Sequence, residues 1–131
     1  MTNIILIGLL AGLIINIFDV SVTVLTVAKK WNEVLKKQGI DFTPFTPAYY
    51  VTASFVAGIL LVWFSKILFM VYGMNRGVML FAAISIWFIT RLYGAGHVVM
   101  KQMPFKIFAV MSLGLLLGFV IAGQLVFSLI K

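Results

Sequence analysis

Four long apolar segments constrain the fold of this chain more than any other feature. They cover roughly residues 4–28, 48–72, 78–100 and 104–130. A helix needs about 20 apolar residues to cross the hydrocarbon core of a bilayer, and each segment is long enough. Short connections between long helices favour antiparallel neighbours. The sequence therefore predicts an all-α fold, a four-transmembrane-helix antiparallel bundle that forms a single domain over residues 1–131.

The composition excludes the two main alternatives to a membrane protein. Hydrophobic residues make up 63% of the chain and charged residues only 10%. A soluble domain has about a quarter of its residues charged, so this chain has too few polar side chains to cover a water-exposed surface. Intrinsic disorder requires low hydrophobicity and high charge, which is the opposite composition.

The segments between the apolar runs contain residues that typically end and begin helices. Gly39 follows the charged stretch 29–38 and is placed as a helix C-cap. Thr46 and Pro47 fit an N-cap followed by proline in the first helical turn. Residues 73–77 form a short glycine-containing connection that favours a tight turn.

The distribution of positive charge predicts the orientation. Cytoplasmic loops carry an excess of lysine and arginine. Six basic residues fall on one side of the predicted spans: Lys29, Lys30, Lys36, Lys37, Lys101 and Lys106. Three fall on the other: Lys66, Arg76 and Lys131. We therefore expect a multi-pass protein of the bacterial inner membrane with both termini outside.

The net charge of +7 does not indicate nucleic-acid binding, because the basic residues lie at the ends of apolar runs, where they contact anionic lipid headgroups. Membrane lipids are thus expected partners. The stretch 29–38 combines Trp31, Val34 and Leu35 with four lysines. It is interpreted as a lipid-surface anchor or, alternatively, as a docking face for a partner protein.

Asp19 and Arg91 lie inside predicted spans, where an ionisable side chain requires a partner or a water path. Each lies ten residues before a basic residue at the cytoplasmic boundary, Lys29 or Lys101, which corresponds to a depth of about 15 Å. Because opposite charges share one depth, we expect an intramembrane ion pair. Either the pair fixes the packing of the first and third spans, or it belongs to a proton or ion relay.

The first span also carries a small-residue and polar stripe at helical spacing. Its members are Gly8, Gly12, Asn16, Asp19, Thr23 and Thr26. Small residues allow helices to approach closely, and polar residues hydrogen-bond across the interface. The last span repeats the spacing with Gly114, Gly118 and Ala122. We interpret both as helix-packing surfaces within the bundle, with a homodimer interface as the alternative.

Enzymatic chemistry is not expected. The chain has no cysteine, one histidine and three acidic residues, too few for most metal sites or for a catalytic triad. The histidine, His97, lies near small residues and could serve as an axial ligand to haem or chlorophyll. The alternative is a hydrogen-bonded residue at the membrane boundary.

Two segments carry a resemblance to known proteins. The run from Gly8 to Asp19, GLLAGLIINIFD, and the later Trp31–Leu35, WNEVL, resemble those of small uncharacterised bacterial four-span integral membrane proteins. The resemblance covers mainly the first 40 residues. It implies a four-helix membrane bundle and implies no activity.

Three functions remain open from the sequence. The favoured interpretation is a non-catalytic accessory or structural subunit that packs against other membrane protein subunits or against itself. The main alternative is a small transporter or channel component, with a polar path at Asn16, Asp19 and Arg91. The third is a haem- or pigment-binding subunit that uses His97.

Overall fold

The computed structural model describes residues 2–39, 46–99 and 104–130, and these residues are helical apart from short connections. In chain order the elements are α1 (Thr2–Val22), the π-helix η1 (Thr23–Val27), α2 (Ala28–Lys37), α3 (Thr46–Tyr72), α4 (Arg76–Val99) and α5 (Phe105–Ile130). No strand occurs in these ranges. The predicted all-α class is confirmed.

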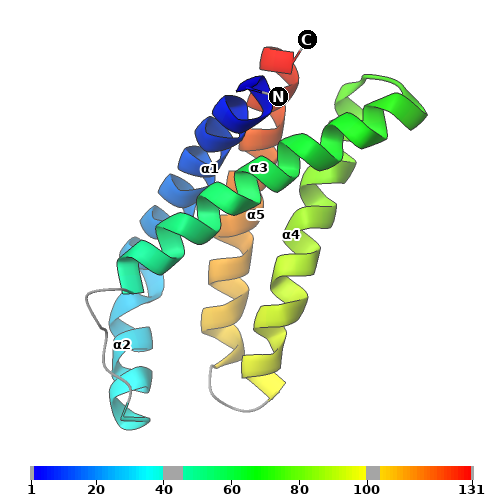
Figure 1. Ribbon diagram of the computed structural model, residues 1–131. Coiled ribbons are helices and arrows are strands. Elements are labelled where there is room, and N and C mark those ends of the chain that lie inside the picture. Colours follow the sequence, from blue (N-terminus) through cyan, green and yellow to red (C-terminus); the bar gives the residue numbers. More distant parts are fainter. Residues whose placement is uncertain (1, 40–45, 100–103, 131) are drawn as a thin grey trace.

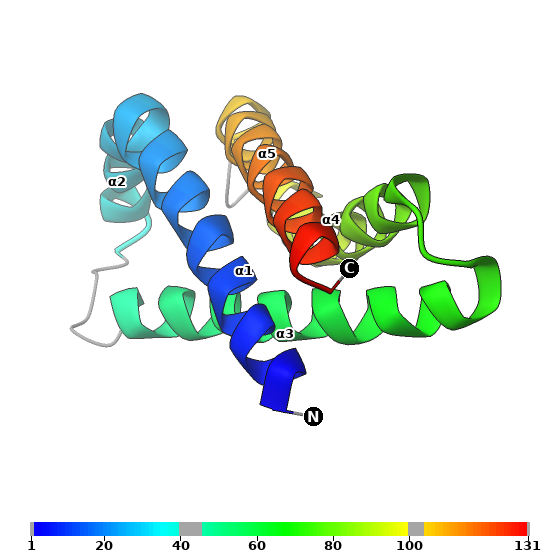
Figure 2. The same ribbon diagram turned by 90° about the horizontal axis from the view of Figure 1, so that it is seen from above.

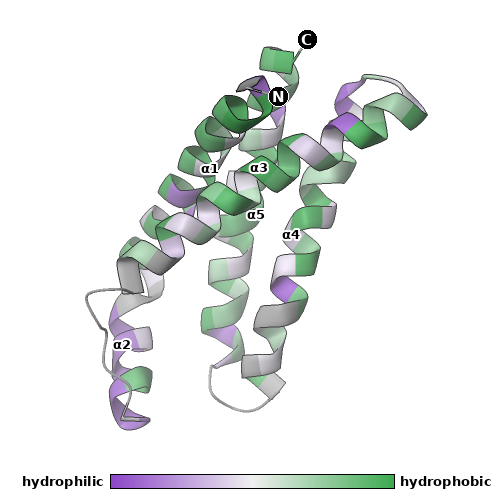
Figure 3. Cartoon of the chain, viewed as in Figure 1, coloured by the Kyte–Doolittle hydropathy of each residue, from purple (hydrophilic) through white to green (hydrophobic). Residues whose placement is uncertain are grey.

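Within the described residues, three helical segments are long and apolar enough to cross a membrane, namely Asn3–Thr26, Tyr50–Tyr72 and Phe105–Ile130. They match three of the four predicted spans to within about two residues. The remaining prediction, 78–100, falls on α4 and extends into residues whose side chains lie outside the described part of the chain. Figure 3 shows green over much of the long helices and purple concentrated on α2.

The long helices alternate in direction, and α1 begins at the same end of the molecule at which α5 finishes (Figure 1). We call this the terminal end and the opposite end the α2 end. Helix α1 packs on α3 and α5, and α4 packs on α5 and less extensively on α3. Helix α3 lies obliquely across the others in both views (Figures 1 and 2), whereas a regular four-helix bundle keeps its helices about 20° from parallel.

Glycines at the crossing of α1 and α3 explain this oblique packing. A Cβ atom placed on Gly58 would lie 2.2 Å from the carbonyl oxygen of Gly8 and 2.3 Å from the nitrogen of Gly12. The two backbones are therefore in direct contact. Close glycine contacts of this kind allow steep crossings between membrane helices.

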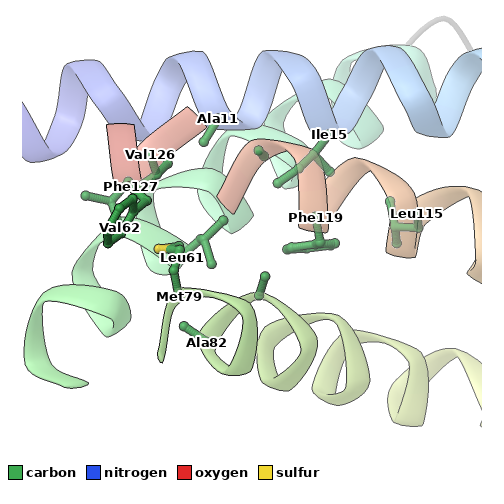
Figure 4. Close-up of a cluster of buried hydrophobic side chains, with 12 residues drawn as sticks. Ala11, Ile15, Leu61, Val62, Met79, Ala82, Leu115, Phe119, Val126 and Phe127 are labelled. Carbon is green, nitrogen blue, oxygen red and sulfur yellow. The ribbon is translucent and has the colours of Figure 1, made fainter. Parts of the chain in front are cut away.

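The apolar core lies toward the terminal end, where side chains from α1, α3, α4 and α5 meet (Figure 4). Phe119 of α5 is the largest fully buried side chain. It lies beside Ile15 of α1, while Leu61 and Val62 of α3 approach Met79 of α4 (Figure 4). Small residues on facing helices let these large side chains interdigitate.

The helix ends follow the sequence signals. Helix α3 begins at Thr46, one residue before Pro47, the predicted first helical residue. Gly39, after α2, and Gly73, after α3, have positive φ angles of 72° and 84°, which glycine adopts without steric cost. Asn75 caps α4, because its side-chain oxygen accepts a hydrogen bond of 2.9 Å from the amide of Val78. A connection of residues 73–75 therefore joins α3 to α4, shorter than the predicted turn at 73–77 because α4 already begins at Arg76.

Candidate functional site

The stripe predicted on the first span divides into two functional parts. Gly8 and Gly12 contact α3 at the backbone crossing. One turn further, Asn16 meets Ser54 of α3, whose hydroxyl donates to Asn16 Oδ1 at 3.4 Å and to the Tyr50 carbonyl at 3.0 Å. Beyond Asn16, Asp19 and Thr23 face a cavity, whereas Thr26, the last member of the stripe, is exposed.

This cavity, which we call the Asp19 cavity, lies toward the α2 end and has a volume of about 220 Å³. Elements from four parts of the chain line it: α1 with η1, α2, α3 and α5. The lining residues are Asn16, Asp19, Val20, Thr23, Val24, Trp31, Tyr50, Val51 and Met111. Three members of the stripe, Asn16, Asp19 and Thr23, thus share one wall of a mostly apolar space.

The π-helix η1 begins at this wall. The chain passes from α1 into η1 at Thr23 and returns to α-helix at Ala28. The hydroxyl of Thr26 donates to the carbonyl of Val22, the residue that precedes η1. Single π-turns within α-helices occur frequently at functional sites, because they alter the direction of the side chains around them. Here the altered turn provides Thr23 and Val24 to the cavity.

Asp19 and Arg91 are electrostatically coupled but not joined. The carboxylate and the guanidinium attract each other, yet no hydrogen bond or ion pair between them occurs in the described part of the chain. Instead, the guanidinium carbon of Arg91 lies 6.0 Å from the centre of the Phe108 ring. The expected ion pair is therefore an attraction at a distance, because α1 and α4 are not packed against each other.

Two buried polar atoms near Arg91 have unmet hydrogen-bonding capacity. Arg91 Nε and Ser112 Oγ are buried and have no hydrogen-bond partner. They belong to the same contact between α4 and α5, where Trp87 Nε1 donates to the Ser112 carbonyl at 2.8 Å. Buried unsatisfied groups are rare and costly in native proteins. Neither residue is among the described lining residues of the Asp19 cavity.

The predicted glycines of the last span contact α1. A Cβ atom on Gly114 would lie 2.6 Å from the Val22 side chain, and one on Gly118 would lie 3.0 Å from Phe18. Together with the crossing at Gly58, these contacts place α1 between α3 and α5. They position the wall of the cavity that carries Asp19.

The remaining candidates are either absent from the described lining of the cavity or outside the described residues. The side chain of His97 and the whole of Lys101 lie outside the described residues. The four lysines of α2 are exposed. At the terminal end, Arg76 Nη1 donates to Gln124 Oε1 at 2.6 Å and lies 5.0 Å from the Phe127 ring centre. Sequence reasoning did not identify this contact.

Sequence reasoning also missed the cavity residues that come from other helices. Trp31, Tyr50 and Met111 lie far from Asp19 in the sequence. Trp31 was instead interpreted as part of a lipid-surface anchor or a docking face. The signals for the site in the sequence were the carboxylate inside a span and the polar stripe that leads to it.

Comparisons with protein families, with curated proteins and with solved structures find no match to this chain. The functional assignment therefore depends on the geometry of the site.

Proposed function

We propose that this protein is a non-enzymatic, multi-pass membrane protein that acts as a small transporter or channel component. The observation that carries the proposal is the Asp19 cavity, in which Asn16, Asp19 and Thr23 face one space among apolar helices. Polar and ionisable groups inside a membrane mark the pathways of substrates, ions and protons.

Two further features support a path rather than a closed structural contact. The Asp19 carboxylate is not held by Arg91 in a hydrogen-bonded pair, so it remains available to a ligand. Arg91 Nε and Ser112 Oγ also lack partners among the described residues. A purely structural pair gains most when both charges are fully hydrogen-bonded to each other. The missing hydrogen bond between Asp19 and Arg91 favours a role in which water or a solute pairs with these groups.

The proposal includes the membrane topology. We propose that α4 crosses the membrane as a fourth span, with Arg91 facing the protein interior. The lysines of α2 and Lys106 then lie on the cytoplasmic side, and both termini lie outside. The shared position of the first and last helix ends supports this topology (Figure 1).

The absence of cysteine in the chain permits a direct test in sealed vesicles. Asn16→Cys is the test variant, and Leu13→Cys, on an outward face of α1, is the control. If the protein forms a path, a small membrane-impermeant thiol reagent modifies position 16 when added from either side, faster than position 13. Reaction from one side only would describe a dead-end cavity, and equal slow reaction at both positions would reject the proposal.

The second candidate is the accessory or structural subunit favoured by the sequence. The observation behind it is the outward face of α4, where Phe81, Phe88 and Ile89 are more than half exposed. Aromatic residues are enriched at protein–protein interfaces. Chemical crosslinking at position 88 in the source membrane, followed by native electrophoresis, distinguishes the accessory subunit from the transporter or channel component. Capture of one larger partner at a fixed ratio favours the subunit, and crosslinking to lipid alone opposes it.

A further inference from the structure

The chemistry of the Asp19 cavity indicates what kind of ligand it accepts. We propose that it binds a small monovalent organic cation, an alkylammonium ion with an apolar or aromatic body. The inference rests on the proposed function, because it assigns a ligand class to the same site. Charge, aromatic lining, size and depth each contribute to it.

Charge favours a cation. Asp19 is the one acidic residue among the described lining residues, and none of these is a lysine, arginine or histidine. Arg91 attracts Asp19 from outside the lining set and makes no hydrogen bond with it in the described chain. The carboxylate therefore keeps its capacity to pair with a positive group inside the cavity.

The aromatic residues favour an organic cation. Trp31 approaches from α2 and Tyr50 from α3, so two rings from separate elements border the space that Asp19 faces. A cation near the face of tryptophan or tyrosine is attracted by the ring quadrupole, and aromatic rings are a common means of recognising quaternary ammonium groups. Val20, Val51 and Met111 provide apolar contacts for the body of such a ligand.

The same lining disfavours a metal ion or an anion. Calcium and magnesium prefer six or more oxygen ligands, whereas most of this lining is hydrocarbon and aromatic. An anion would require a positive group at the wall. The described lining residues include no positive group. Arg91 lies outside this lining, with its guanidinium carbon 6.0 Å from the centre of the Phe108 ring.

Size and depth favour a free molecule over a lipid headgroup. The cavity of about 220 Å³ is smaller than a typical drug-binding pocket of about 300 Å³ or more. Asp19 lies ten residues before Lys29, about 15 Å along the helix from the charged boundary, whereas Trp31, which also lines the cavity, lies two residues beyond Lys29. The carboxylate is therefore deeper than lipid headgroups reside, and the aromatic side of the cavity reaches the boundary. Val24 at the rim is 63% exposed and Tyr50 is 48% exposed, so the cavity has an open side.

The test uses the full chain in a non-ionic detergent and isothermal titration calorimetry. The three probes share one shape: benzyltrimethylammonium, its neutral carbon analogue neopentylbenzene, and the anion phenylmethanesulfonate. The proposal predicts binding of the cation alone. Asp19→Asn should weaken it about tenfold or more, because a charged partner is lost. Glu33→Gln, which removes an exposed acid of α2 outside the cavity, should leave it unchanged.

Arg91 gives the most discriminating variant. Because its positive charge competes with the ligand for Asp19, Arg91→Gln should tighten cation binding by roughly threefold to tenfold, and Arg91→Lys should not. An anion site anchored by Arg91 would show the opposite, with binding of phenylmethanesulfonate that Arg91→Gln abolishes. That result would overturn the proposal, as would equal binding of the cation and its neutral analogue.

Two valine-to-phenylalanine variants, one inside and one outside the cavity, locate the bound ligand. Val51→Phe fills the cavity from α3 and should abolish binding, whereas Val56→Phe, at a half-exposed valine outside the lining, should not. Circular dichroism checks that each variant keeps its helices. If added phosphatidylethanolamine displaces the probe, the site belongs to a lipid ammonium headgroup and the free-cation proposal fails. If the cation does not bind, a thiol reagent can still label position 16 from both sides of the vesicle. The cation-binding proposal and the transport proposal can therefore fail independently.

Discussion

The two halves of the helix assembly use the same first helix in opposite ways. Toward the terminal end, Gly8 and Gly12 bring α1 into backbone contact with α3, and the surrounding core is apolar and fully buried. Toward the α2 end, the same face of α1 carries Asp19 and Thr23, and the helices enclose a cavity. A stripe with one spacing thus produces a closed contact in one half and an open polar site in the other.

Residue size accounts for the difference. Glycine allows the backbones of α1 and α3 to touch, whereas the side chains of Asn16, Asp19 and Thr23 hold the neighbouring helices apart. The oblique course of α3 then increases the separation away from the crossing (Figure 2). The closely packed half therefore fixes the geometry of the cavity, and three sets of variants test this division.

Gly58→Val should have the largest effect, because its side chain would overlap the backbone of α1, which has no alternative position. We expect a loss of about 3 kcal/mol or more in the free energy of unfolding, measured by denaturant titration in detergent. Gly96→Ala is the matched control, because nothing lies within 4 Å of a Cβ at that helical position. Alanine there should be neutral or stabilising by up to about 1 kcal/mol. Similar stability of both variants would contradict the close crossing.

The second test concerns the coupling of Asp19 and Arg91 across the open half. Each single change, Asp19→Asn or Arg91→Leu, should lower stability by about 2 kcal/mol, since it leaves one charge without its counterpart. The double variant should be milder than the sum by about 1 kcal/mol. A double-mutant cycle in the same unfolding assay gives this coupling energy. A coupling of zero would mean that the two charges act independently.

Thr23→Leu should have the smallest effect, since the added volume enters the cavity rather than a packed interface. We expect a change of less than about 1 kcal/mol in unfolding free energy. Ala82→Leu is the control in the closed half, where Ala82 is fully buried, and it should cost about 1–3 kcal/mol. If position 23 proves as intolerant as position 82, the α2 end is packed more tightly than the cavity requires.

Much of the helix layout could be predicted from the sequence, because hydrophobic runs and capping residues act locally. The bounds of three spans, the start of α3 to within one residue and the positive φ of Gly39 all followed from such signals. The matched depth of Asp19 and Arg91 was informative about their attraction. It did not predict their separation, which depends on which helices are neighbours.

The cavity itself was beyond sequence reasoning. Trp31 and Tyr50 reach it only because the chain turns back between α2 and α3. The π-helix at Thr23–Val27 has no composition that distinguishes it from α-helix. The oblique course of α3 depends on Gly58 meeting two glycines of α1. The spacing of residues within one helix does not predict which residues of another helix they contact.

Hydrogen–deuterium exchange along the first helix tests the central contrast most directly. The amides of residues 19–27 border the cavity and η1, whereas those of residues 7–15 lie in the closed half, so local opening should cost less in the first group. The account predicts fast exchange at 19–27 and strong protection at 7–15, measured by mass spectrometry of the protein in lipid nanodiscs. Residues 105–112 of α5, at the same end of the molecule, control for fraying near the membrane boundary. Equal protection of residues 7–15 and 19–27 would contradict the division into a closed and an open half.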